Sequence, residues 1–334
     1  MRTATRLSAT FAIALLAAAC QDRSASLTDP HQNQPSVNPN AAASTDRDSQ
    51  DQNDEVLDRA VIHRTVEGMR LARAAATAQA SANNLYYHGG VGGIGVETAP
   101  KIYLVIWGSQ WNNNDPSGEQ AILKSFFAGI GGSRWYNSVT QYCQGIPSGS
   151  STCTANFAGN PAGIYAGVWV DNGSKAPGRP SQSQIAAEAV RAAQHFGNTT
   201  AAKNASVQYV IASATHNNSS GFGTQYCAYH SSTSSSVGNV AYTNLPYITD
   251  AGASCGANFN GLGPKAGITI VGGHEAGETA TDQFPNGGWL DSSGAENGDK
   301  CAWTSGTANV SFSTGVFPVQ PLWSNRTSSC AISY

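Results

Sequence analysis

The chain has 334 residues, a net charge of −3 and a charged fraction of only 12%. This length is enough for one large domain or two small ones with a sizeable core. The charge balance excludes the basic surface typical of nucleic-acid-binding proteins, so no nucleic-acid partner is expected. Few charges together with 36 glycines are typical of an extracellular, loop-rich protein that contains β-structure.

The N-terminus has the pattern of an export signal. Arg2 and Arg6 precede an apolar run that is too short to span a bilayer, which predicts a signal peptide at residues 1–19. Small residues stand directly before Cys20, which predicts a lipidated cysteine, with ordinary cleavage after Ala19 as the alternative. We therefore expect an exported protein, lipid-anchored at the cell envelope or secreted, whose only membrane contact is this lipid.

Six of the seven cysteines remain once Cys20 is set aside. An even number suits disulfide bonds in an oxidising compartment. Proximity along the chain favours the pairs Cys143–Cys153, Cys227–Cys255 and Cys301–Cys330, although other connectivities are open.

Composition divides the rest of the chain into three parts. Residues 20–54 are polar and almost free of large apolar side chains, which predicts a disordered tether. Residues 55–84 repeat apolar positions at helical spacing, which predicts an amphipathic helical segment, either a spacer or a pro-segment. The globular part is expected at residues 85–334.

Strands and helices are predicted to alternate in this globular part. Strands are expected at 102–107, 167–170 and 207–211, with helices near 117–128, 133–142 and 181–195. Ser181 and Gln184 have the spacing of a capping box before the last helix, and β or irregular structure is expected after residue 300. The pattern predicts a single α/β (α+β) layered domain with a mixed sheet, stabilised by disulfides and monomeric.

Acidic residues gather near the C-terminal third of the chain. Six carboxylates fall between residues 275 and 299, while no Lys or Arg occurs between Lys265 and Lys300. Like charges held close together repel and raise each other's pKa. A bound divalent cation would relieve this repulsion.

The segment from His274 to Glu278 reads His-Glu-Ala-Gly-Glu. On a helix His274 and Glu278 share one face, as in the His-Glu-x-x-His zinc motif, and Glu275 can act as general base on a water. Glu296 is the first candidate for a third ligand and Asp299 the second. Carboxylate ligands make Zn²⁺ a weaker Lewis acid and shift preference towards Ca²⁺.

Two structural interpretations of the same residues stay open. His274 could be a hydrogen-bonded core histidine, with Glu278 on a solvated helix face. The acidic residues could instead form a structural Ca²⁺ loop, built from Asp282, Asp291, Glu296 and Asp299.

Several spaced motifs resemble the plant exordium (phosphate-induced) family and its bacterial secreted relatives. They include the motif at 274–278 with Thr281 and Asp282, then Trp289, Glu296, Asp299 and Cys301, and upstream residues 87–90, 102–108, 221–222 and 227–230. The resemblance spans roughly residues 86–325. It implies an extracellular or cell-wall protein, groups Glu296 and Asp299 with the motif at 274–278, and raises His230 as a metal ligand or transition-state donor.

Together these observations predict a zincin-like domain in which a helix carrying 274–283 packs under the sheet. The expected function is that of a metal-dependent hydrolase, a candidate zinc peptidase acting on peptide. Zn²⁺ would be held by His274, Glu278 and Glu296, with Asp299 or His230 completing the site and Glu275 as general base. The alternative is a non-enzymatic cell-surface module that binds cell-wall glycan and carries a structural Ca²⁺ ion.

Overall fold

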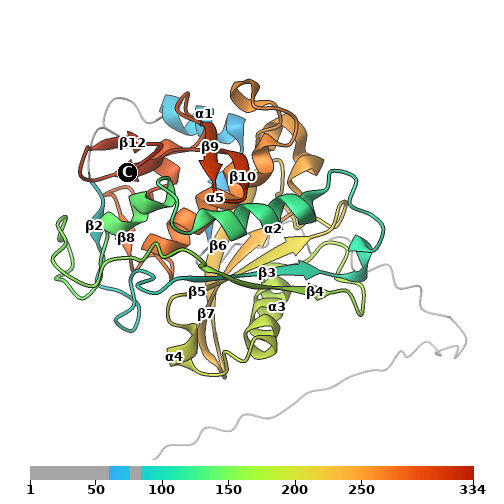
Figure 1. Ribbon diagram of the computed structural model, residues 1–334, viewed down its shortest axis with the longest axis horizontal. Coiled ribbons are helices and arrows are strands. Elements are labelled where there is room, and N and C mark those ends of the chain that lie inside the picture. The colour runs from blue at the N-terminus through green and yellow to red at the C-terminus, as the bar shows by residue number, and fades with distance from the viewer. Residues whose placement is uncertain (1–59, 76–83) are drawn as a thin grey trace, which may run out of the picture. The chain divides into compact units, whose positions relative to one another are not determined.

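The computed structural model describes residues 60–75 and 84–334, drawn in colour in Figure 1. The predicted signal peptide at 1–19, Cys20 and the tether at 20–54 lie outside the described residues. None of the helices within the described ranges has the length and apolar character needed to cross a membrane.

A six-stranded mixed sheet forms the centre of the fold, with strand order β1-β6-β7-β5-β3-β4. Its strands are β1 (Val61–Arg64), β6 (Tyr226–Ser235), β7 (Gly238–Leu245), β5 (Val207–Ser213), β3 (Lys101–Trp107) and β4 (Tyr165–Asp171). Strands β7, β5, β3 and β4 run parallel, whereas β6 and β1 each pair antiparallel with their neighbours. This mixed sheet confirms the predicted α/β class.

Helices cover both faces of this sheet (Figure 1). On one face lie α3 (Gln182–His195) and α4 (Ala201–Asn204), which contact β5 and β7. On the other lie α2 (Glu119–Ile130) and α5 (Ala266–Thr281), which contact β3 and β6, respectively. Every residue of β5 is buried because both of its faces are covered. The capping box predicted at Ser181 and Gln184 is present at the start of α3.

The remaining elements are short and surround α5. Two-stranded pairs are formed by β2 (Tyr86–Tyr87) with β8 (Trp289–Leu290), β9 (Ala308–Phe312) with β10 (Gly315–Val319), and β11 (Leu322–Ser324) with β12 (Ser329–Ala331). The 3₁₀ helices are η1 (Ser109–Trp111), η2 (Tyr136–Gln141), η3 (Ile248–Cys255), η4 (Phe259–Gly261) and η5 (Asp299–Cys301). The helix expected at 133–142 is therefore the shorter 3₁₀ helix η2, and the β-structure expected after residue 300 is confirmed.

Three disulfide bonds join the cysteines as predicted. The Cα–Cα distances are 5.7 Å for Cys143–Cys153, 5.5 Å for Cys227–Cys255 and 5.6 Å for Cys301–Cys330. All three lie in the range normal for a disulfide. They fit a protein of an oxidising, non-cytoplasmic compartment.

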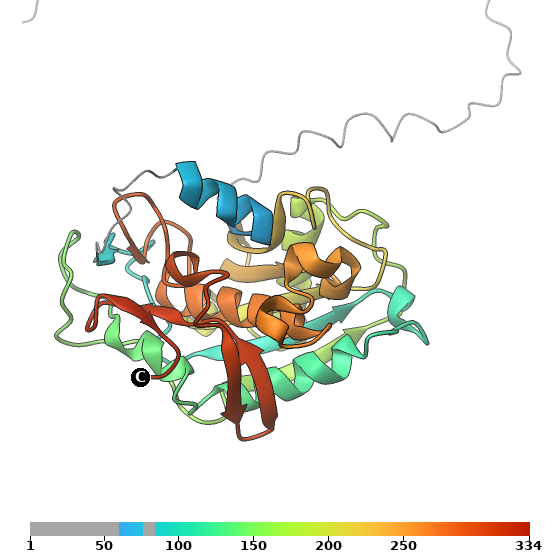
Figure 2. The ribbon, with the colours of Figure 1, turned by 90° about the horizontal axis from the view of Figure 1, so that it is seen from above.

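The prediction of a helical segment is wrong for residues 61–64. These residues form β1, and only from Val66 does a helix follow, α1 (Val66–Ala75). β-branched Val61 and Ile62 favour an extended strand, and β6 offers an edge with which they can pair. Thr65 then caps α1, since its Oγ1 accepts the backbone N–H of Gly68 at 3.1 Å. The domain thus includes residues before 85, with α1 on its outside (Figure 2).

Candidate metal centre

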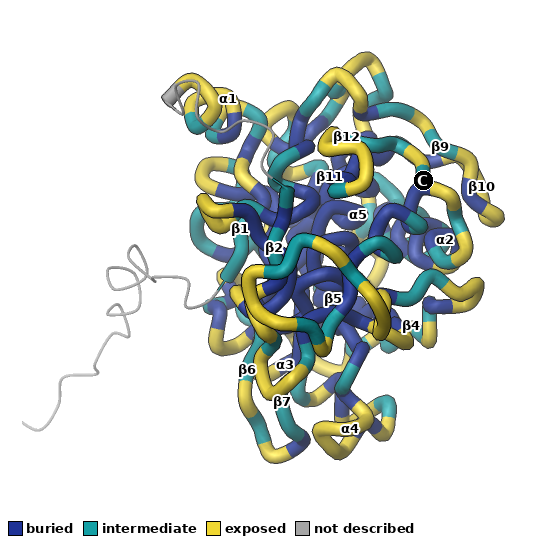
Figure 3. Tube along the Cα trace, turned by 90° about the vertical axis from the view of Figure 1, so that its left-hand side faces the viewer, coloured by how far each residue is buried: buried dark blue, intermediate teal, exposed yellow. Residues whose placement is uncertain are grey.

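The helix α5 carries the His-Glu-x-x-Glu motif through the interior of the domain (Figure 3), and all of its residues are buried. Its glycines allow other segments to approach closely: a Cβ on Gly277 would lie 2.9 Å from Cδ1 of Leu322, and one on Gly273 would lie 3.1 Å from the Trp135 ring. This close approach explains why α5 contains glycine, a residue that otherwise weakens a helix. The interpretation of Glu278 as part of a solvated helix face is wrong, since its exposed fraction is 0%.

His274, Glu278 and Asp299 form the first group of possible ligands. Nε2 of His274 lies 3.0 Å from Oε1 of Glu278 and 3.9 Å from Oδ1 of Asp299. Asp299 is held in place because its backbone N–H donates to Oε1 of Glu278 at 2.8 Å. One ligand atom from each residue lies within 4.8 Å of the others, a spacing at which a single ion can bind all three.

A second group forms around His230 on β6. Its Nε2 lies 2.8 Å from Oε2 of Glu296 and 3.6 Å from Oε2 of Glu278. His230 also shares a possible ligand group with Glu275 and Glu278. Of the two candidates for a third ligand, the structure therefore places Asp299 beside His274 and Glu296 beside His230.

His63, which sequence reasoning missed, belongs to the same cluster. Its ring stacks on that of His274, with centroids 3.7 Å apart and an interplanar angle of 4°. Trp303 stacks on His63 at 4.8 Å. His63 is fully buried, and a nitrogen of its ring can share an ion with His274 and Glu275. No signal in the sequence pointed to it, because it is a lone histidine in a segment with a helical pattern.

Many polar atoms of this cluster lack a hydrogen-bond partner. Both ring nitrogens of His63 and both carboxylate oxygens of Glu275 are buried and unpaired, as is Oε2 of Glu278. Nε2 of His274 lies near the carboxylates of Glu278 and Asp299, but neither ring nitrogen of His274 makes an aligned hydrogen bond. Buried unpaired polar atoms each cost about 1–3 kcal/mol, so a site that gathers several of them calls for a ligand.

The protonation of the cluster follows from burial and mutual repulsion. Burial, then Glu278 and Asp299, raise the pKa of Glu275 well above its usual value. Burial first, and the charge of Glu278 second, raise the pKa of Asp299 to about 7. The charge of Arg64 acts in the opposite direction.

The imidazoles differ: at His274 the effect of burial is outweighed by the charges of Glu278 and Asp299, which raise its pKa, whereas the pKa values of His230 and His63 are lowered. Burial lowers the pKa of His230 to about 4, and burial together with His274 lowers the pKa of His63 well below 6.5. Neutral imidazoles are the form that binds a metal. A divalent cation among the carboxylates would keep these ionised as well, so the donor set fits such an ion.

The two other acids of the sequence cluster have partners of their own. Asp282 accepts the backbone N–H groups of Asn286 and Gly287, at 2.7 and 3.0 Å. Asp291 pairs with Lys300 at 2.8 Å. Both carboxylates therefore stabilise loops, and Asp282 also forms a side-chain hydrogen bond with Glu296. Of the four acids in the predicted Ca²⁺ loop, Glu296 and Asp299 are the ones that contact a histidine.

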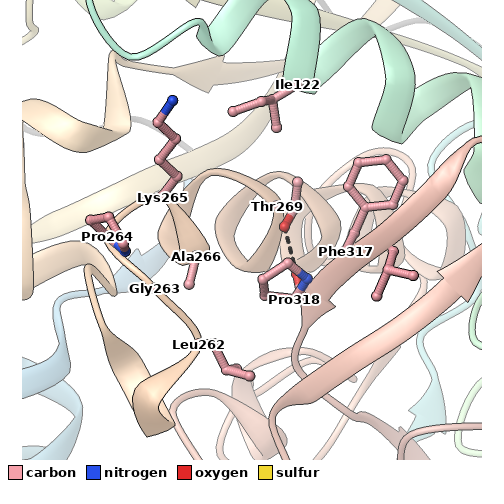
Figure 4. Close-up of a pocket in the computed structure, with 10 residues that line it drawn as sticks. Ile122, Leu262, Gly263, Pro264, Lys265, Ala266, Thr269, Phe317 and Pro318 are labelled. Atoms are coloured by element: carbon pink, nitrogen blue, oxygen red, sulfur yellow. Dashed lines mark hydrogen bonds between the residues drawn. The ribbon is translucent and has the colours of Figure 1, made fainter.

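A pocket of about 320 Å³ lies at the N-terminal end of α5 (Figure 4). Its lining is mainly apolar and includes Ile122, Leu262 and Phe317; Thr269 donates from its hydroxyl to the carbonyl of Pro318 at 2.6 Å. None of the cluster residues lines this pocket. The histidines and glutamates of the cluster are closed off, with exposed fractions of at most 1% for His274, Glu275, Glu278 and Glu296, whereas the side chain of Asp299 is 17% exposed.

Comparisons with known proteins give no match: no family model, no curated protein and no solved structure is significantly similar to this chain. The resemblance to the exordium family stays a prediction that rests on its spaced motifs.

Proposed function

We propose that this protein is an exported metal-dependent hydrolase with a zincin-like arrangement, in which Zn²⁺ is held by His274, Glu278 and Asp299. The observation that carries the proposal is a group of three possible ligand atoms on and beside α5, all within 4.8 Å of one another, from the buried His274 and Glu278 and the part-buried Asp299. The predicted signal peptide, the predicted lipidation of Cys20 and the resemblance to an extracellular family support the location. The three disulfides agree with it.

Glu275 is the proposed general base. It follows His274 on α5, and its two unpaired carboxylate oxygens lie among the histidines and Glu278. In this role it takes a proton from the attacking water and passes it to the leaving amine. A bound Zn²⁺ supplies polarisation of the carbonyl and activation of water.

His230 is the proposed transition-state donor in this scheme, and Glu296 positions it. Glu296 contacts its Nε2 at 2.8 Å and orients the ring from the side of β6. From there the imidazole faces Glu278 and can donate to the oxygen on which negative charge develops. Glu296 then acts through His230, as carboxylates beside metal-site histidines do.

The alternative is a non-enzymatic surface module that binds cell-wall glycan and uses Ca²⁺ for stability. The carboxylate-rich donor set favours this ion. The hydrogen bonds of Asp282 and the ion pair of Asp291 count against it, because they leave few free oxygens for a Ca²⁺ loop.

Metal analysis of the purified protein and hydrolysis of casein by Glu275→Gln test the proposal. We expect bound Zn²⁺ in both proteins and a loss of the basal activity in the variant by about 10²- to 10⁴-fold. Glu97→Gln is the matched control, since Glu97 is a buried carboxylate outside the cluster. Full activity of Glu275→Gln would remove its catalytic role, and protein without bound metal would remove the metal centre.

A further inference from the structure

The closed state of the metal centre has an identifiable cause. His274 is covered by the ring of His63, and His63 is covered in turn by Trp303. The indole N–H of Trp303 donates to the carbonyl of Arg64 at 2.8 Å, which fastens the end of β1 over the centre. A hydrolase that acts on a polymer needs access to these residues. In the position described here, the segment Val61–Ala75 blocks that access.

β1 lies along an edge where another chain could bind. It pairs only with β6, so without β1 the strand β6 would form the edge of the sheet. Val61 lies opposite His230 and His63 opposite Ala228, in antiparallel register. Exposed sheet edges bind extended peptides by adding them as a further strand. β1 therefore has the geometry of a bound peptide beside the proposed general base.

The side chains of β1 also lie as those of a bound peptide would. His63 directs its ring into the cluster, where one nitrogen lies within 4.8 Å of ligand atoms of His274 and Glu275. A substrate group that entered the place of this ring would lie beside His274 and Glu275. Ile62 belongs to the opposite side of the sheet and packs against the core beneath α3.

The segment Val61–Ala75 is held without a covalent cross-link, by the pairing of β1 with β6, by the buried Met69 and by a hydrogen bond from Arg73 to the carbonyl of Ala302. Residues 60–75 contain no cysteine, and the pairing of β1 with β6 becomes irregular between His63 and Arg64. On α1, Leu71 is 54% exposed and Arg70 pairs with Glu67 of the same helix. The closed form also carries costs, namely the unpaired nitrogens of His63 and a φ of 53° at Trp303, which bulky residues rarely adopt.

We propose that Val61–Ala75 is an internal occupant of the substrate site, with β1 in place of an extended polypeptide substrate. The substrate class is then a polypeptide that pairs antiparallel with β6 and places a peptide group between His230 and the position of His63. Displacement of β1 opens the site. This inference rests on the proposed hydrolase function for its catalytic part, whereas the exchange of β1 for a peptide can be measured without catalysis.

The test uses the full chain, loaded with Zn²⁺, and a fluorescent synthetic peptide with the sequence of residues 60–75. The variant replaces both Ile62 and His63 by proline. In a strand every second residue donates its backbone N–H to the neighbouring strand, and proline has no N–H. One of the two prolines must therefore remove a hydrogen bond between β1 and β6. Leu71→Ala is the control, as an exposed change in the same segment. Fluorescence anisotropy measures peptide binding, and casein measures hydrolysis.

We expect the proline variant to bind the peptide at least about tenfold more tightly than the wild type or Leu71→Ala, because the competing internal strand is lost. Its hydrolysis of casein should rise by a similar factor and fall again when excess peptide is added. A variant with a cooperative melting transition that gains neither binding nor activity would overturn the proposal.

A second variant tests the proposal if the prolines prevent folding. A recognition sequence for a site-specific protease replaces residues 76–83, and the folded chain is cleaved there. Exchange of the released segment for the labelled peptide supports the proposal, and retention of the segment against excess peptide overturns it. If the peptide binds but no form hydrolyses casein and Glu275→Gln changes nothing, the hydrolase function fails while the occupancy of the edge by β1 stands.

Discussion

Gly298 lies directly against His274: a Cβ on Gly298 would fall 2.8 Å from Nδ1 of His274 and 2.8 Å from Oε1 of Glu278. The backbone of Gly298, with φ −77° and ψ −44°, would accept any residue, so only space requires glycine here. The loop that brings Asp299 to α5 therefore depends on the absence of a side chain at this position.

Gly298→Ala should push His274 or Glu278 out of position and weaken Zn²⁺ binding by about 10- to 100-fold. Gly173→Ala is the matched control, because nothing lies within 4 Å of a Cβ at Gly173. Competition with a chromophoric chelator measures both affinities. Equal affinities would show that the geometry around His274 is not needed for the metal.

The roles of Asp299 and Glu296 can be separated by changes that each remove one negative charge. Asp299→Asn should lower Zn²⁺ affinity by more than Glu296→Gln does, since Asp299 shares a possible ligand group with His274 and Glu278 whereas Glu296 contacts His230. Isothermal titration with Zn²⁺ gives the comparison. The reverse order would make Glu296 the ligand, as its sequence spacing predicts.

Removal of the metal should lower the melting temperature. Without a cation, both carboxyl oxygens of Glu275 and Oε2 of Glu278 stay buried and unpaired, and burial and the charge of Glu278 disfavour the ionised form of Glu275. At a free Zn²⁺ concentration of about 100 Kd, binding contributes roughly 2.7 kcal/mol to stability. Thermal melts with EDTA, followed by Zn²⁺ or Ca²⁺, measure the effect. Recovery with Ca²⁺ alone would favour the surface module over the hydrolase.

Glu97 should make stability depend on pH. It is fully buried, and burial raises its pKa to about 8, against the effect of a hydrogen bond from Gln208 at 2.8 Å. The native protein therefore keeps Glu97 protonated where the unfolded chain, with a pKa near 4.5, has lost the proton. Its contribution is fully present below pH 4.5 and is lost as the pH rises through about 8.

Glu97→Gln mimics the protonated acid and should make the free energy of unfolding depend less on pH. The contribution of Glu97 to this free energy changes by roughly 5 kcal/mol at most. Urea unfolding across the same pH range measures the slope. Glu67→Gln, at an exposed site on α1, serves as the control. Parallel slopes for the wild type and Glu97→Gln would show that Glu97 is ionised in the native protein.

Local patterns in the sequence predicted much of the fold. The apolar runs in β3 and β5, the capping box of α3 and the three disulfides were all predicted before the structure. Each depends on residues near one another in the chain, or on one strong rule such as the pairing of cysteines. The prediction for β1 was wrong because it also used only local spacing. The apolar residues of β1 continue the helical pattern of α1, and only the pairing with β6 makes them a strand.

For the candidate site, the sequence by itself determined that His274, Glu275 and Glu278 lie together on one helix, since a helix brings residues four apart to the same face. Only the tertiary structure decided that Asp299 reaches His274 while Glu296 reaches His230, and that Asp282 and Asp291 are used by their own loops. It also decided that His63 covers the centre. These relations join segments up to some two hundred residues apart, and they depend on strand order and close packing, which no spacing in the chain records.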